Sequence, residues 1–223
     1  MSQLKVKELL DFCNKYTSKT VNELIEEFAI TSKSKQINYI VSKSIIHAYK
    51  GKEYGEYLLE SLNLTLKTVQ LNSIGTPKES MSFPVIDYME IVNEEWQTSS
   101  LRNMFKKDFL FFVFKPQGSL NVLDKVILWR MPETILDSEV KSVWTKTVEM
   151  LKTGNVVKEA TPKKTYYNFP AEADNDVCHV RPHGSKAIDS AKLPVPDVKT
   201  GYVNCTKHSF WLNKLYIKSI INS

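Results

Sequence analysis

Thr65 and Lys67, two positions apart in the segment LNLTLKT, are the residues of this sequence best spaced for catalysis on a strand. Leu62, Leu64 and Leu66 alternate there with polar residues, and this period of two predicts a half-buried strand with Thr65 and Lys67 on one face. Metal-dependent nucleases hold Mg²⁺ against a phosphate with carboxylates and set a lysine beside them to orient or activate water. The segment has that Glu-x-Lys layout, with threonine in place of glutamate.

The acids nearest to this strand are Glu53, Glu56 and Glu60. A threonine hydroxyl is a neutral, weak ligand for Mg²⁺, which prefers anionic oxygens. We therefore expect metal affinity at Thr65 to be lost. A displaced carboxylate from residues 53–60 is the alternative, although it leaves the position of Thr65 uncharged.

Cysteine and histidine gather in two other segments, CHVRPH and CTKH, and these contain Cys178, His179, His183, Cys205 and His208. A zinc site is conceivable, but both spacings are loose for structural zinc. The three cysteines are an odd number without CxxC spacing, which is typical of reduced, buried thiols. We expect neither a metal nor another cofactor in this chain.

Helical spacing of apolar residues predicts helices over 3–15, 20–28 and about 35–49, the second opened by a capping box at Thr20 and Glu23. Strands are predicted at 81–92, 108–115 and 121–130, followed by a helix over 138–152 that ends at Gly154. Residues 160–199 should be largely loops with a short strand, VCHVRP, before a strand at 201–205 and a helix from His208. The expected fold is α/β, a mixed central sheet flanked by helices.

We expect one domain over 1–223, with a helical part at about 1–50, a sheet core at about 57–155, and recognition loops with a C-terminal helix at about 160–223. A net charge of +5 permits a polyanionic partner without requiring one. The apolar runs are too short to span a membrane, so we expect a cytoplasmic protein with no membrane partner. Of the 30 basic residues only Arg102, Arg130 and Arg181 are arginines, which favours places that need a bidentate fork.

Six segments, in order along the chain, resemble the MutH family of mismatch-repair nicking endonucleases: LNLTLKTV, SIGTPKE, WQTSSLR, VWTKTVEMLKTGNV, the VRP at 180–182 and the terminal FWLNK. The family includes GATC-cutting type II restriction endonucleases, some of which are built from two MutH-like halves. The chain resembles such a half, and by this resemblance the C-terminal one. The resemblance implies a restriction-endonuclease-like fold.

The nuclease signature of the family is Asp-x6-Glu-x-Lys. Matched on Lys67, it puts Leu58 at the aspartate and Thr65 at the glutamate, and a further family glutamate matches Ser44 or a neighbour. Glu60 would need a two-residue shift to replace Leu58. The resemblance therefore implies no intact catalytic site here, with Mg²⁺ required only in the catalytic half of a parent enzyme.

In the family, the loop that carries Arg-Pro and the aromatic residue before the last helix read the GATC site. These are Arg181, Pro182 and Trp211 here. An arginine fork fits guanine O6 and N7, although Arg181 could instead pair with Asp174 or Asp176, and Trp211 could be core packing. Phosphate contacts are expected from the flanking His183, Lys186, Lys207 and Lys214.

Thr98, Ser99 and Arg102 match a family motif whose hydroxyls can hold phosphate oxygens, although Thr-Ser followed by Arg can equally cap a helix. Lys33 and Lys35 precede the third predicted helix and can reach the minor groove or the backbone.

The favoured function is that of a non-catalytic, effector half of a restriction endonuclease that binds GATC-containing double-stranded DNA. The partners expected from the resemblance are this DNA, an N-terminal catalytic domain of the same protein, and a second copy in a homodimer on DNA. An active Mg²⁺-dependent GATC nuclease with displaced carboxylates is the first alternative. A protein-interaction module that has lost DNA affinity is the second.

Overall fold

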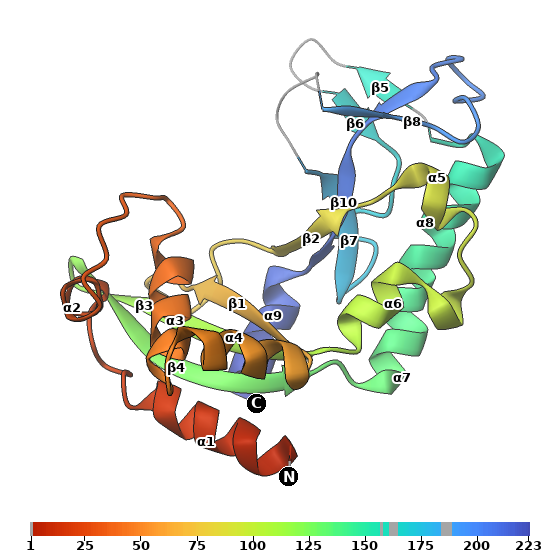
Figure 1. Cartoon of the computed structure of the whole chain (residues 1–223). Coiled ribbons are helices and arrows are strands. Elements are labelled where there is room, and N and C mark those ends of the chain that lie inside the picture. The colour runs from red at the N-terminus through yellow and green to blue at the C-terminus, as the bar shows by residue number, and fades with distance from the viewer. Residues whose placement is uncertain (1, 157, 161–164, 184–188) are drawn as a thin grey trace. The chain divides into compact units, whose positions relative to one another are not determined.

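The computed structural model describes residues 2–156, 158–160, 165–183 and 189–223. The chain forms two compact units (Figure 1): unit 1 comprises residues 1–79, 107–130 and 218–223, and unit 2 comprises residues 80–106 and 131–217. The expected sheet core at about 57–155 is therefore divided between the two units.

In the described residues, unit 1 contains helices α1 to α4, strands β1, β3 and β4, and the end of helix α9. Its elements are α1 (Ser2–Asn14), α2 (Val21–Glu27), α3 (Ile37–Ala48), α4 (Lys52–Ser61), β1 (Leu64–Gln70), β3 (Asp108–Gln117) and β4 (Leu120–Arg130), with α9 (Lys214–Asn222) entering it at Lys218.

In the described residues, unit 2 contains short helices, the long helix α8, and strands in three small sheets. Its elements are β2 (Met81–Val85), α5 (Tyr88–Ile91), a 3₁₀ turn η1 (Trp96–Thr98), α6 (Ser100–Phe105), α7 (Glu133–Ile135), a π-helical turn η2 (Leu136–Val140), α8 (Lys141–Thr153), β5 (Lys158–Ala160), β6 (Thr165–Tyr167), β7 (Cys178–Pro182), β8 (Ser190–Lys192), β9 (Asn204–Thr206) and β10 (His208–Leu212).

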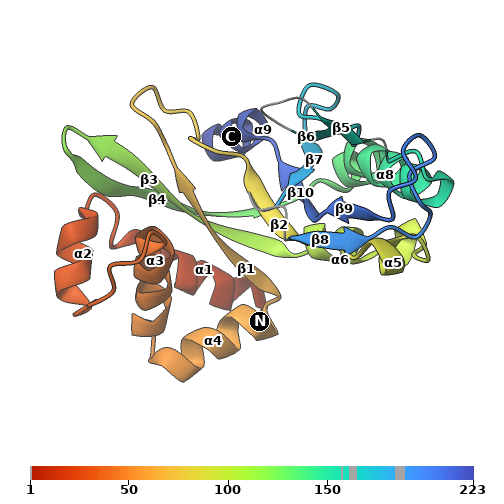
Figure 2. The same ribbon diagram turned by 90° about the horizontal axis from the view of Figure 1, so that it is seen from above.

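The sheet of unit 1 is mixed, as the sequence predicts. Its order is β1-β3-β4, with β1 parallel to β3 and β3 antiparallel to β4, and Figure 2 shows β1 beside the long β3–β4 hairpin. One face carries Leu64, Leu66, Leu110 and Phe112, which share a buried core with residues of α1, α2, α3 and α4. The α/β fold class with helices against a mixed sheet is thus confirmed.

The three predicted N-terminal helices are present as α1, α2 and α3. The capping box is confirmed: the backbone N–H of Glu23 donates to Thr20 Oγ1 over 3.1 Å, and that of Thr20 donates to Glu23 Oε2 over 2.7 Å. Helix α4 was not predicted. It lies close against α3 because Gly55 has no side chain, and a Cβ there would sit 2.7 Å from the carbonyl oxygen of Ile46.

In unit 2, β10 is the central strand of an antiparallel sheet with the order β2-β10-β7. Residues 208–212 were expected to begin the last helix, and that expectation was wrong. The segment is buried except at the half-buried Trp211. It bonds to a strand on each side, so pairing prevails over helical periodicity. Helix α9 begins only at Lys214.

The segment 81–92 was expected to be a strand throughout, but only its first part is one. Asp87 ends the extended segment because its Oδ1 accepts the backbone N–H groups of Met89 and Glu90 over 2.9 and 3.2 Å, which caps α5. The helix predicted over 138–152 is confirmed as α8, and Gly154 follows it in the left-handed conformation at φ 69°.

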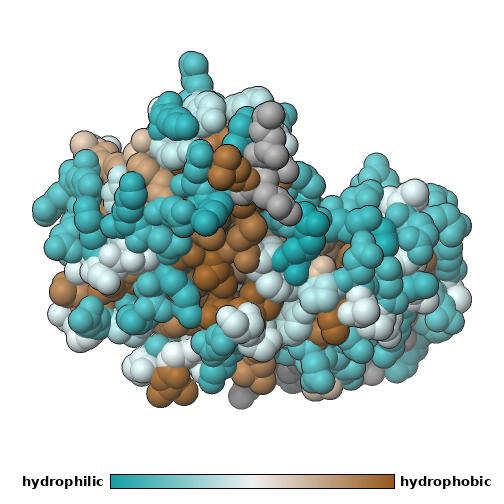
Figure 3. Space-filling model, turned by 90° about the horizontal axis from the view of Figure 1, so that it is seen from below, coloured by the Kyte–Doolittle hydropathy of each residue, from teal (hydrophilic) through white to brown (hydrophobic). Residues whose placement is uncertain are grey.

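The surface is mixed in character. Figure 3 shows a largely polar face with apolar side chains gathered in its middle. Among the helices of the described residues, none has the length and apolar content that crossing a membrane requires.

Candidate nucleic-acid interface and remnant nuclease site

Strand β1 positions Thr65 and Lys67 on one face of the unit 1 sheet. Their neighbours Leu64 and Leu66 enter the helix-covered core, and side chains alternate along a strand, so Thr65 and Lys67 project from the opposite face. The predicted strand with Thr65 and Lys67 on one face is therefore confirmed.

The surroundings of Lys67 on that face are aromatic. In the sheet register Thr65 lies beside Phe109, and Lys67 lies beside Phe111. The rings of Phe109 and Phe111 are 5.9 Å apart, and Trp129 is within 6 Å of both. Burial lowers the pKa of Lys67. The rings of Phe109, Phe111 and Trp129 supply no hard oxygen ligand for Mg²⁺.

The two other positions matched to family carboxylates lie in helices. Leu58, on α4, has no exposed surface and belongs to the core on the face of Leu64 and Leu66. An aspartate there would be buried among apolar side chains. The match of Leu58 to the family aspartate stays a prediction. Ser44, on α3, is half-buried.

The three acids that precede β1 in sequence are either paired with basic residues or exposed. Glu56 accepts from Lys43 Nζ at 2.9 Å and lies 2.7 Å from His47 Nε2, and these two contacts lower the pKa of its carboxyl group. Glu53 and Glu60 are exposed. Within the described ranges no group of three or more His, Cys, Asp or Glu side chains is arranged to hold a metal ion.

The cysteines and histidines of the zinc alternative do not converge. Cys178 pairs with Leu212 at one end of β7 and β10, whereas His208 pairs with Pro182 at the other. His208 Nδ1 lies 2.8 Å from Tyr88 Oη and 2.6 Å from the Thr206 carbonyl oxygen, and burial lowers its pKa to about 4. Cys178 is buried, like the other two free cysteines, and burial raises its pKa to about 12.

Arg181 and Trp211 meet on one face of the unit 2 sheet. Arg181 pairs with Ser209, and Trp211 pairs with His179, so all four side chains project from the same face. The guanidinium carbon of Arg181 lies 4.4 Å from the centre of the Trp211 ring, within the range of a cation–π contact. Arg181 is exposed and Trp211 is half-buried.

Behind Trp211, a buried histidine completes the stack. The rings of His179 and Trp211 are 6.5 Å apart and 18° from parallel. His179 Nδ1 lies 2.6 Å from Asn213 Oδ1, and Asn213 in turn donates to the carbonyl of Asn175 over 2.6 Å. Burial lowers the pKa of His179, which keeps the imidazole neutral at pH 7.

Most of the residues predicted to contact phosphates near this stack lie in the described part of the chain. His183 Nδ1 lies 2.7 Å from Ser209 Oγ, and its backbone N–H donates to the carbonyl of Lys207 over 2.9 Å. Pro182 and Lys214 are exposed, and Lys207 is half-buried. Lys186 lies outside the described residues. In unit 1, Lys33 and Lys35 are exposed between α2 and α3.

The motif Thr98–Arg102 forms a helix cap. Ser99 is fully buried, and its Oγ accepts the Arg102 N–H over 3.2 Å at the start of α6. The Arg102 guanidinium donates twice to Asp137, over 3.0 and 3.1 Å, while Thr98 is exposed. The capping alternative is thus present at Ser99, and Arg102 is paired with Asp137. A phosphate contact by this motif stays a prediction.

The three arginines differ in their partners. Arg130 forms a two-pronged contact with Asp108, as Arg102 does with Asp137. Arg181 forms no ion pair with any carboxylate of the described residues, Asp174 and Asp176 included. The guanidinium groups of Arg102 and Arg130 are thus bound to carboxylates of the chain itself, whereas that of Arg181 stacks on an indole at the surface.

Sequence reasoning did not single out His179, Ser209 or Asn213 as parts of this surface. The alternation of His179, Arg181 and His183 along one strand was a usable signal, because such residues share a face. Ser209 and Asn213 gave none, since residues 208–212 were expected to be helical.

Comparison with known proteins finds two similarities. Residues 49–138, which include β1 and the Thr98–Arg102 cap, match the family model described as DNA mismatch repair enzyme MutH. The type II restriction enzyme Sau3AI of Staphylococcus aureus is 32% identical over 239 aligned residues, which cover 91% of this chain and 48% of that enzyme. The chain thus spans about half the length of this relative. The chain is therefore similar to MutH-like endonucleases, a family that includes mismatch repair and restriction enzymes.

Proposed function

We propose that this chain recognises double-stranded DNA that contains GATC and does not cut it. The observation that carries the recognition part is the Arg181–Trp211 contact. An exposed guanidinium held over an indole keeps its outer N–H groups free of carboxylates among the described residues. A fork in that state suits the O6 and N7 acceptors of guanine.

The surroundings of Arg181 support a role in positioning. Stacking restricts a long, flexible side chain, so less entropy is lost when DNA binds. Trp211 is itself backed by the buried ring of His179, whose partner Asn213 fixes the orientation of the imidazole. His183, Lys207 and Lys214 lie near the same strands and would supply contacts to phosphates.

The non-catalytic part of the proposal rests on unit 1. Lys67 stands where the family carries its lysine, but Thr65 and Leu58 stand at the positions matched to the family glutamate and aspartate. Glu56 is held by Lys43 and His47. A cut would need a displaced carboxylate, and Glu60, at the end of α4, is the one of Glu53, Glu56 and Glu60 that is nearest to Thr65 in sequence.

We further propose that the chain acts as the effector half of a larger endonuclease. Its alignment with 48% of Sau3AI supports this proposal. A catalytic domain of the same protein would use Mg²⁺ to cut, while this half binds a second GATC site. A homodimer on DNA is the other assembly that the family resemblance implies.

The experiment is a competition between duplexes. The chain is titrated, without Mg²⁺, with a labelled duplex that carries one GATC and with a duplex of identical composition in which these four base pairs are permuted. We expect the GATC duplex to bind at least about tenfold more tightly, since each wrong base pair costs roughly 1–3 kcal/mol. Equal affinity for the two would overturn the recognition proposal.

A further inference from the structure

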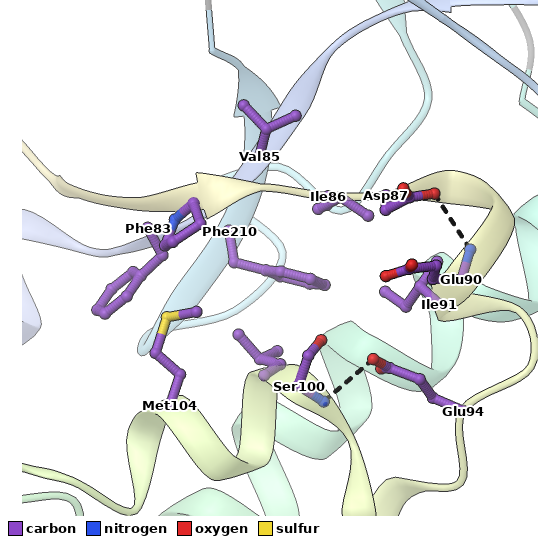
Figure 4. A pocket seen from close by; sticks show the side chains of 12 residues that line it. Phe83, Val85, Ile86, Asp87, Glu90, Ile91, Glu94, Ser100, Met104 and Phe210 are labelled. Carbon is purple, nitrogen blue, oxygen red and sulfur yellow. Dashed lines mark hydrogen bonds between the residues drawn. The ribbon is translucent and has the colours of Figure 1, made fainter.

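Unit 2 contains a small cavity between β2, β10, α5 and α6. It holds about 160 Å³, comparable with an apolar cavity of about 150 Å³ that takes up one benzene molecule. Figure 4 shows the side chains of Phe83, Phe210 and Met104 on one side. Ile86, Ile91 and Leu101 extend the apolar lining.

Three carboxylates line the other side of the cavity, those of Asp87, Glu90 and Glu94 (Figure 4). Asp87 and Glu90 are exposed, so the acidic side reaches solvent. None of the three forms an ion pair with a basic residue in the described part of the chain. In a protein of net charge +5, this is a local reversal of charge beside an apolar surface.

Glu94 has an oxygen that lacks a partner. Its Oε1 accepts the backbone N–H of Ser100 over 3.2 Å, which points the carboxylate toward the cavity. Its Oε2 is buried and has no hydrogen-bond partner among the described residues. A buried carboxylate oxygen without a donor is costly, and a cation in the cavity would remove that cost.

We propose that this cavity binds the side chain of a lysine presented by a partner polypeptide. A lysine buries its four-carbon stem against apolar surface and keeps its ammonium group at a polar edge. Here the stem would lie against Phe83, Phe210 and Met104. The ammonium group would donate to Glu94 Oε2 and to the neighbouring carboxylates.

The cavity is distinct from the proposed DNA contact. Phe210 and Trp211 are consecutive residues of β10, so their side chains project from opposite faces of the unit 2 sheet. Phe210 lines the cavity, whereas Trp211 lies under Arg181. Three carboxylates repel phosphates, which excludes DNA as the occupant. The proposal therefore does not depend on DNA recognition.

The test uses the whole chain labelled with ¹³C in its methionine methyl groups. Met104 lines the cavity, and the buried Met131 and Met150 of the same unit serve as internal references. The resonance of Met104 is assigned with Met104→Leu. The chain is titrated with n-butylammonium, with N-acetyl-lysine N-methylamide, and with n-butanol as the neutral control.

We expect both cations to shift Met104 saturably, with millimolar dissociation constants, while Met131 and Met150 stay in place. n-Butanol should bind about tenfold more weakly than n-butylammonium. The variants Glu94→Gln and Glu90→Gln should each bind n-butylammonium about tenfold more weakly than the parent chain, as expected when a charge-assisted hydrogen bond is lost. Glu149→Gln, which removes an exposed acid of α8, should change nothing. In each variant, unchanged methyl resonances of Met131 and Met150 show that the protein is folded.

Three results would overturn the proposal. The first is no shift at Met104 with either cation. The second is equal binding of n-butanol and n-butylammonium, which would make the cavity merely apolar. The third is binding of n-butylammonium without binding of the blocked lysine, which would exclude a polypeptide as the partner.

Discussion

The guanidinium carbon of Arg181 lies 4.4 Å from the centre of the Trp211 ring, and these two residues come from adjacent antiparallel strands. The contact joins the charge that would meet a base to the aromatic residue that would hold it in place. Stacked on a fixed ring, Arg181 has fewer rotamers to lose on binding.

The substitution Arg181→Lys tests whether recognition needs the bidentate guanidinium group or only its positive charge. A lysine retains one positive charge but cannot make a bidentate contact to guanine. We expect discrimination between GATC and permuted duplexes to fall by roughly 1–3 kcal/mol, with affinity for permuted DNA nearly unchanged. The measurement is fluorescence anisotropy with both duplexes. Arg130→Lys, at the fork that binds Asp108 in unit 1, is the matched control and should leave discrimination intact.

Lys214→Ala should act on phosphate contacts alone. Lys214 is exposed at the start of α9, so its loss should weaken binding to both duplexes equally. The slope of log affinity against log salt should decrease by about 1. Lys146→Ala, an exposed lysine of α8, is the control. A change in the ratio between duplexes would show that Lys214 reads bases instead.

Leu58 tests the position matched to the family aspartate. Because Leu58 is fully buried, Leu58→Ala should lower the free energy of unfolding by about 2–5 kcal/mol, measured by urea denaturation. Leu4→Ala, on the exposed surface of α1, should change it by less than about 0.5 kcal/mol. Leu58→Asp should be more damaging than Leu58→Ala, since it buries a carboxylate. A stable Leu58→Asp variant that cuts DNA would contradict the assignment of Leu58 to the core.

Asp137 should set part of the acid stability of unit 2. The Arg102 guanidinium and the Trp96 indole N–H hold the pKa of Asp137 at about 2, below its usual 3.8. A depressed carboxyl pKa contributes stability above the usual value, and this contribution is lost as the pH falls through the depressed one. Asp137→Asn should therefore melt below the parent at pH 7, and the difference should shrink between pH 4 and pH 2. Glu149→Gln should show no such difference, and a pH-independent gap for Asp137→Asn would contradict the ion-pair explanation.

The regular parts of the fold could be predicted because their signals are local. The capping box at Thr20 and Glu23, the alternation around Thr65 and the glycine after α8 each act within a few residues. Strand β10 could not be predicted in this way, because its conformation depends on hydrogen bonds to β2 and β7, which are distant in sequence. Asp87 ends β2 through its side chain, a local signal that the sequence analysis did not use.

The candidate site was predictable to a similar degree. Arg181 and Trp211 were named from motifs, and the strand pairing that brings them together follows only from the fold. The motif with Ser99 and Arg102 was ambiguous between phosphate binding and capping, and burial decides for capping. Leu58 was matched by the spacing of the family signature, and its place in the core follows only from the fold.

The most direct test of the central claim is to incubate the purified chain with the GATC duplex and Mg²⁺ and to follow binding and strand integrity in the same samples. We predict a retarded complex with the GATC duplex, intact strands on a denaturing gel, and no change with Glu60→Gln. Strand cleavage that requires Mg²⁺ and is lost in Glu60→Gln would contradict this account and establish an active nuclease with a displaced carboxylate.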